Sequence, residues 1–258
     1  MSTRPQAPTH QPHSAEIRQV YERLLAGAPV SSRHVEVAGG RVYLLEHGAG
    51  PPVVVLHGTA NPAGFLLPLL RELHGVQAIA PDRPGVGLSD PIDLPQDRYR
   101  ETAVPKTRCP LPLRLATTPV VGRLLSRLAP PSPRSTLRFA HHVAREKETF
   151  ARHPDLVDLL VAAGRDPITD HVSKAELRVF VSPFGVRRRS RVGPDELRRL
   201  AMPTLVVWGE RDPVGSIPVA RAVTELIPDA RLEVLPTGHG PWLGQPARTA
   251  ATVLELMR

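Results

Sequence analysis

Two segments near the carboxyl terminus of this chain carry an aspartate and a histidine that could share a proton. The apolar run at residues 203–208 reads as a buried strand, and the turn that follows it ends at Asp212. A second strand-like run, residues 232–235, leads to the glycine-flanked His239. An aspartate that orients a histidine is the acid–base half of a Ser-His-Asp relay, in which the histidine takes a proton from a nucleophile.

Each of these two residues has an alternative interpretation. Glu210 lies in the same turn as Asp212 and competes with it for the role of the acid. A histidine in a loop is more often a surface residue than a catalytic one. The glycines on both sides of His239 and its position directly after a strand favour the catalytic interpretation.

The third member of such a relay, the nucleophile, has no candidate in the expected pattern. It should stand at the centre of G-x-S-x-G, on a sharp turn between a strand and a helix. None of the 258 residues forms this pattern with Ser, Cys or Asp at its centre. Cys109 is a poor substitute, because Pro110 follows it and has no N–H to donate to an oxyanion. Three serines lie in turns or segments unsuited to this role: Ser89, Ser182 and Ser216.

The elements that would position these residues alternate between strands and helices at both ends of the chain. Such alternation predicts the α/β class, with a mostly parallel open sheet flanked by helices. The predicted strands are residues 34–37, 41–46, 52–56, 76–80, 204–208 and 231–235. The predicted helices are residues 14–27, 63–73, 217–226 and 243–257.

The middle of the chain has a different character. It contains no convincing strand, only Leu-, Arg- and Ala-rich segments of helical spacing that prolines interrupt. These patterns predict four regions: a flexible tail at 1–14, the first half of the core at 15–104, a helical cap at 105–195 and the second half of the core at 196–258.

Composition narrows the possible partners. The net charge is +8, but most of the basic residues are arginine and the densest run, residues 187–191, has no interleaved aromatic residue. We interpret this run as a solvated surface and expect no nucleic-acid partner.

The single cysteine excludes an intrachain disulfide and a cysteine-based metal site. With no apolar run of membrane-spanning length and no signal-like N-terminus, we expect no membrane partner and a cytoplasmic protein.

Four motifs, in this order, resemble the α/β-hydrolase superfamily, in particular its capped, serine-type branch of esterases, lactonases, epoxide hydrolases and carbon–carbon bond hydrolases. The motifs are Leu56-His57-Gly58, residues 82–89 (DRPGVGLS), residues 208–213 (WGERDP) and Gly238-His239. The resemblance covers about residues 35–90 and 202–258, and the segment between them matches only in its helical character.

The resemblance implies a role for each matching position. Asp212 would be the acid, His239 the base, and the turn His57, Gly58, Thr59 and Ala60 would bind the substrate and its oxyanion. The implied substrate is a small ester, a lactone or a related molecule, and neither a cofactor nor a metal is implied. A non-catalytic protein that binds a small ligand on the same fold is the alternative.

The family's nucleophile segment is missing between the DRPG turn and the predicted cap. Residues 98–104 look like the start of a helix that leads to it, yet the cap begins at Pro105. The missing β-α-β unit would need roughly 30 residues or more. In the family's strand order the two absent strands are central, so their loss leaves two open ladder edges. Either these edges pair, which would bring Val54 next to Val206, or the fold is destabilised. Because the nucleophile is absent, we expect the hydrolase to be impaired or inactive.

Overall fold

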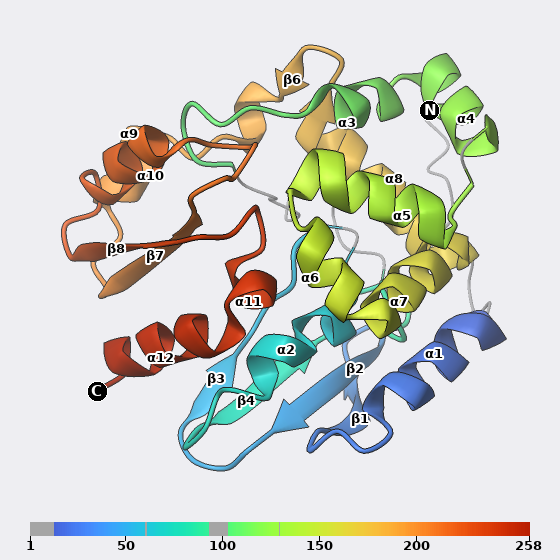
Figure 1. Ribbon diagram of the computed structural model, residues 1–258, viewed down its shortest axis with the longest axis horizontal. Helices are drawn as coiled ribbons and strands as arrows, with labels where there is room; N and C mark the ends of the chain where they lie inside the picture. Colours follow the sequence, from blue (N-terminus) through green and yellow to red (C-terminus); the bar gives the residue numbers. More distant parts are fainter. Residues whose placement is uncertain (1–12, 60, 93–102, 129) are drawn as a thin grey trace.

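The computed structural model describes residues 13–59, 61–92, 103–128 and 130–258 (Figure 1). Its strands are β1 Ser31–Val37, β2 Gly40–His47, β3 Pro52–Val54, β4 Gln77–Pro81, β5 Val181–Ser182, β6 Gly185–Val186, β7 Thr204–Gly209 and β8 Ala230–Leu235. Its α-helices are α1 Ala15–Leu25, α2 Leu67–Leu70, α3 Leu111–Ala116, α4 Pro119–Leu128, α5 Pro133–Phe139, α6 Lys147–Arg152, α7 Pro154–Arg165, α8 Pro167–Phe180, α9 Pro194–Arg198, α10 Ile217–Thr224, α11 Pro241–Gly244 and α12 Pro246–Leu256. Three shorter segments are the 3₁₀-helices η1 Ala63–Leu66 and η3 Arg188–Ser190 and the π-helix η2 Ala140–Ala144.

The amino-terminal half forms a four-stranded mixed sheet in the order β1-β2-β4-β3. The strands β1 and β2 form the predicted antiparallel hairpin, which turns at Gly39 with a φ of +95° that favours glycine. The strand β4 pairs antiparallel with β2 and parallel with β3. Its residues Ala78 and Ala80 are fully buried. The α/β fold class is therefore confirmed, with antiparallel pairs contributed by the hairpin.

The helix α1 begins where its sequence predicts. The hydroxyl of Ser14 accepts a hydrogen bond from the N–H of Ile17 at 3.4 Å and so caps the helix. Of the tail predicted at 1–14, residues 1–12 lie outside the described residues. His13 and Ser14, however, are held by the buried carboxylate of Asp166. These two residues belong to the folded part of the chain rather than to a tail.

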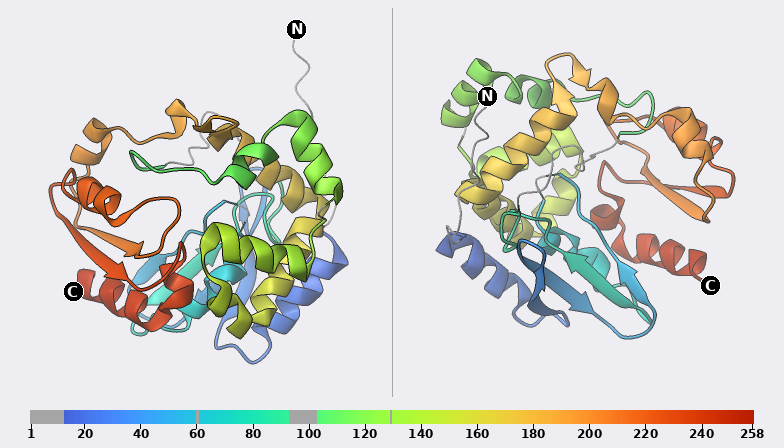
Figure 2. Two further views of the ribbon diagram at one scale, coloured as in Figure 1. Left: turned by 45° about the horizontal axis from the view of Figure 1, so that its top comes forward. Right: turned by 180° about the vertical axis from the view of Figure 1, so that it is seen from behind.

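The carboxyl-terminal half forms a separate two-stranded parallel sheet from β7 and β8. Within the described residues, β3 and β7 belong to different sheets, so Val54 and Val206 are not ladder neighbours. Figure 2 shows the two sheets from behind, with α12 between them. The helix α12 contacts both α2 and β7, and α11 contacts the same two elements. Helix packing rather than strand pairing therefore joins the two halves.

No strand in the described part of the chain pairs with the outer edge of β3, and apolar side chains are exposed there. Val54 is 62% exposed and Leu56 is 67% exposed. The predicted strand 52–56 ends at Val54, although Val55 still donates a backbone hydrogen bond to Ile79 at 2.8 Å. A residue in the middle of a covered parallel sheet would be buried on both faces. This edge has the sequence of a central strand and the surroundings of an edge strand.

The middle of the chain is helical from α3 to α8, as predicted, and its last part forms a small hairpin that the sequence did not predict. The strands β5 and β6 pair through Val181 and Val186. The predicted helix 243–257 is divided into α11 and α12, because Pro246 cannot continue a helix from its preceding turn. No helix among the described residues has the length and apolar character needed to cross a membrane.

Candidate active site

Asp212 and His239 lie together in the loops that follow β7 and β8. The Nδ1 of His239 is 2.9 Å from Oδ2 of Asp212. The other carboxylate oxygen of Asp212 accepts a hydrogen bond from the N–H of Val214 at 2.7 Å. The Asp212 side chain is 7% exposed, whereas that of His239 is 50% exposed. A buried, fixed carboxylate thus holds the proton on Nδ1 and leaves Nε2 as the basic nitrogen.

The parallel pairing of β7 and β8 brings the two loops together. The register joins Gly209 to Leu235 at the carboxyl ends of both strands. Beyond them, the N–H of Arg211 donates to the carbonyl of Thr237 at 2.9 Å. Glu210, the competing acid, is exposed, and its carboxylate has no hydrogen bond to His239. The geometry therefore favours Asp212 over Glu210 as the partner of His239.

Glu146, between η2 and α6, holds the histidine loop in place. Its carboxylate is 4% exposed and accepts hydrogen bonds from the N–H groups of Gly238 at 2.7 Å and Gly240 at 3.2 Å. The N–H of His239 itself donates to the carbonyl of Ala144 at 2.9 Å. A Cβ added to Gly238 would overlap that same carbonyl oxygen. No local pattern predicts the role of Glu146, because its partners are backbone groups more than ninety residues away.

His57 is held by backbone groups as a neutral side chain. Its Nε2 accepts a hydrogen bond from the N–H of Arg83 at 2.9 Å, and its Nδ1 donates to the carbonyl of Gly58 at 2.9 Å. Burial, together with the nearby guanidinium of Arg83, lowers the pKa of His57 to about 4 in spite of the hydrogen bond to Gly58. Thr59 follows in the same turn, and Ala60 lies outside the described residues. His57 therefore shapes this turn and does not serve as a proton carrier near neutral pH.

Arg83, which the sequence offered only as part of a motif, connects this turn to the helical region. Its guanidinium lies 2.7 Å from the carboxylate of Glu176 on α8. Both side chains are largely buried, at 18% and 5% exposed. A buried pair of this kind is costly to break from one side, because the remaining charge loses its partner. The pair fixes α8 over the turn that carries His57.

Asp82, the first residue of the DRPG turn, has a carboxylate that is buried and held by several hydrogen bonds. Its carboxylate accepts hydrogen bonds from Tyr21 Oη at 2.7 Å, from the N–H of Ala63 at 2.6 Å and from the N–H of Leu88 at 2.9 Å. Complete burial raises its pKa to about 6 in spite of these bonds. At Gly87, which has a φ of +64°, a Cβ would overlap this carboxylate. Asp82 therefore organises the turn.

The alternative nucleophiles have other partners. The hydroxyl of Ser89 is buried and donates to the carbonyl of Asp82 at 2.7 Å. Ser182 donates to the carbonyl of Gly185 at 3.0 Å. Burial raises the pKa of the Cys109 thiol, which disfavours the reactive thiolate. Within the described part of the chain, Nε2 of His239 has no hydrogen-bond partner. The predicted helix start at 98–104 lies mostly outside the described residues.

Metal ligation has no candidate in the ranges that the structure describes. No group of three or more His, Cys, Asp or Glu side chains in those ranges is placed to hold a metal ion.

Solved structures resemble this one over most of its length. The naproxen esterase of Bacillus subtilis is 16% identical, with a TM-score of 0.68 over 98% of this chain and 100% of its own. A serine hydrolase of carbazole degradation is 18% identical, with a TM-score of 0.67 over 88% and 98%. The 2-hydroxy-6-oxo-6-phenylhexa-2,4-dienoate hydrolase of Rhodococcus sp. strain RHA1 is 18% identical, with a TM-score of 0.64 over 89% and 99%. No protein-family model matches the chain, and no curated protein does. The three structures, together with the strand and helix order, establish that this chain has the α/β-hydrolase fold.

Proposed function

We propose that this chain is a serine-type α/β hydrolase that has kept its acid–base pair and lost its nucleophile. The observation that carries the proposal is the contact of 2.9 Å between His239 and Asp212 at the ends of two parallel strands. The substrate class is a small ester, a lactone or a related molecule. Esterases and a carbon–carbon bond hydrolase of the same fold support that class.

In this proposal each site residue has a defined role in the reaction. His239 would take the proton of an attacking hydroxyl at Nε2 and return it to the leaving group. Asp212 would hold the imidazole in the required tautomer and stabilise the cation. Backbone N–H groups of the turn at Gly58, Thr59 and Ala60 would receive the oxyanion. The helical region 105–195 would act as the cap over the substrate, between core halves at 15–104 and 196–258.

The missing component is the nucleophile, and its absence should leave little catalysis. Removing the serine from a triad abolishes most of the rate enhancement, because the remaining groups act as a unit with it. As it stands, the chain should therefore bind substrate without turning it over efficiently. The proposal includes a cytoplasmic location and small molecules, rather than nucleic acids or membranes, as partners.

Restoring the segment tests this proposal. A β-α-β unit containing G-x-S-x-G, placed between Val104 and Pro105, should raise the hydrolysis of p-nitrophenyl butyrate at least about 1,000-fold over the unmodified chain. The matched controls are the same insertion with the elbow serine changed to alanine and the insertion combined with His239→Ala. A correctly folded insertion variant, judged by its thermal transition, that shows no serine-dependent turnover would contradict the proposal.

A second candidate is a non-catalytic protein that binds a small ligand on the same fold. The lack of any partner for Nε2 of His239 in the described part of the chain favours it. A saturable, ligand-dependent rise in Tm without turnover, in a panel of apolar esters and alcohols, would support this function. A panel without any shift would count against it.

A further inference from the structure

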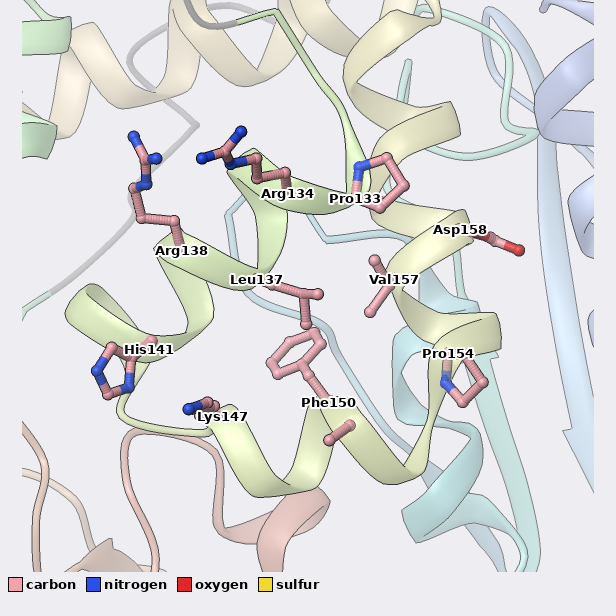
Figure 3. A pocket seen from close by; sticks show the side chains of 11 residues that line it. Pro133, Arg134, Leu137, Arg138, His141, Lys147, Phe150, Pro154, Val157 and Asp158 are labelled. Carbon is pink, nitrogen blue, oxygen red and sulfur yellow. The ribbon is translucent and has the colours of Figure 1, made fainter.

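A groove on the helical region combines an apolar floor with a cationic rim. It lies between α5, α6 and α7 and has a volume of about 540 Å³, within the range of small-ligand pockets (Figure 3). Phe150 and Val157, which are 4% and 5% exposed, form part of its floor, and Leu137 lines its side. The ring of Phe150 packs on Phe65 at a centroid distance of 5.7 Å, which anchors the floor to the core.

Three cationic side chains gather on one side of this groove. Arg134 and Arg138 extend from α5, and Lys147 extends from the start of α6. All three are exposed, and within the described ranges none of them forms an ion pair. Arginines elsewhere, such as Arg33, Arg41 and Arg248, are paired with carboxylates. On that side the groove therefore presents positive charge that no carboxylate of the described residues pairs with.

The acidic residue of the groove lies away from these cations. Asp158 on α7 lines the opposite side, and Figure 3 shows its carboxylate turned outward, away from the three basic side chains. The charge of the groove is thus asymmetric, with a cationic end next to an apolar surface. A complementary ligand needs an anionic head and an aliphatic chain.

We propose that this groove binds an aliphatic monocarboxylate of the fatty-acid class. The carboxylate lies between Arg138 and Lys147, where the guanidinium and the ammonium donate charge-assisted hydrogen bonds. The aliphatic chain lies along the floor formed by Phe150 and Val157 and covers Leu137, whose side chain is 37% exposed, and so removes apolar surface of Leu137 from water. This site is separate from the Asp212–His239 pair, and the proposal does not depend on whether the chain is a hydrolase.

The test uses dodecanoate and the full chain, with calorimetry below the concentration at which dodecanoate forms micelles. We expect saturable binding at one site. The charge reversal R138E/K147E should weaken binding about tenfold or more, because two attractive contacts become repulsive. The matched control R188E/R189E reverses two exposed arginines outside the groove and should leave the affinity unchanged. Because all four side chains are exposed, each double variant should keep the Tm of the original chain.

Further ligands separate the two parts of the proposal. Dodecanol and dodecyltrimethylammonium carry the same chain without the negative charge and should bind at least tenfold more weakly. The proposal is overturned if dodecanoate shows no saturable binding, if the ammonium compound binds as tightly, or if both double variants lose the same affinity. It is also overturned if the chain adsorbs to phosphatidylglycerol vesicles through Arg138 and Lys147 but does not bind dodecanoate.

Discussion

The loops after β7 and β8 and the outer edge of β3 illustrate two different outcomes in one fold. The first region is assembled: β7 finds its partner β8, and the loops beyond them bring Asp212 to His239. At the second, Val54 of β3 and Leu56, two residues beyond its end, are exposed, although the sequence of this segment suits the centre of a sheet. The first region is held together by the pairing of β7 with β8. Among the described residues no strand pairs with the outer edge of β3, and apolar side chains are exposed there.

The same contrast applies to the connection between the halves. The helices α11 and α12 contact α2 on one side and β7 on the other, so the helical layer bridges the interruption in the sheet. Glu146 adds a polar link from the helical region to the histidine loop. Local pairing and helix packing therefore preserve the Asp212–His239 geometry without a continuous sheet.

The largest effect on stability should come from shortening a buried side chain of the first sheet, in comparison with an exposed one at its edge. Leu45 of β2 is fully buried, and Leu45→Ala should lower the free energy of unfolding by about 2–5 kcal/mol through the cavity it leaves. Leu56→Ala removes the same atoms at a position 67% exposed and should cost less than about 0.5 kcal/mol. Urea denaturation measures both. Equal costs would mean that the edge of β3 is covered in solution.

A smaller effect should come from the link that holds the histidine loop. Glu146→Ala leaves the N–H groups of Gly238 and Gly240 buried without their acceptor and should lower the free energy of unfolding by about 2–4 kcal/mol. Glu148→Ala changes an exposed carboxylate two residues away, in the first turn of α6, and is the control. Urea denaturation of the two variants should differ clearly, and similar midpoints would show that Glu146 is not the anchor.

The smallest expected effect concerns His13 and the pH dependence of stability. Its ring nitrogens face the carboxylate of Asp166 at 3.0 Å and the carbonyl of Ser89 at 2.8 Å, two acceptors that favour the doubly protonated ring. Burial lowers the pKa of His13, but these two bonds outweigh it and raise the pKa above 6.5. The protonated imidazole of His13 therefore stabilises the folded state. This contribution is fully present below pH 6.5, the pKa of histidine in the unfolded chain, and it is lost as the pH rises through the higher pKa of the folded state.

Thermal unfolding across that pH range provides the measurement. The Tm of the chain should fall above pH 6.5, relative to the Tm of His13→Gln. The carboxylate of Asp166 should stay ionised throughout this pH range. Burial alone would raise its pKa, but hydrogen bonds, chiefly the one with His13, outweigh burial and hold the pKa well below its usual range. Parallel curves for the two proteins would refute a role for the charged imidazole.

Much of the fold could be predicted from local patterns. The cap of α1 at Ser14, the hairpin at Gly39 and the strands β4, β7 and β8 all follow from residues close together in the sequence. The proximity of Asp212 and His239 could also be predicted, because parallel strands present their carboxyl ends at one edge.

The remaining features depend on distant partners. The sequence does not decide whether β3 and β7 pair with each other or lie in separate sheets. The outcome depends on how α11 and α12 pack between the two sheets. Glu146 meets its backbone donors, and Arg83 meets Glu176, only after the whole chain has folded. The contact of His13 with Asp166 cannot be predicted locally, because a polar, proline-containing segment has the composition of a flexible tail.

We propose that this chain keeps the acid–base pair Asp212–His239 and lacks the nucleophile. The most direct test of this proposal is the hydrolysis of p-nitrophenyl butyrate by the unmodified chain and by its His239→Ala variant, at equal concentration and neutral pH. We expect the same rate for both proteins, close to that of buffer alone. Turnover well above buffer that His239→Ala abolishes would contradict the proposal, because such turnover requires a nucleophile within this chain.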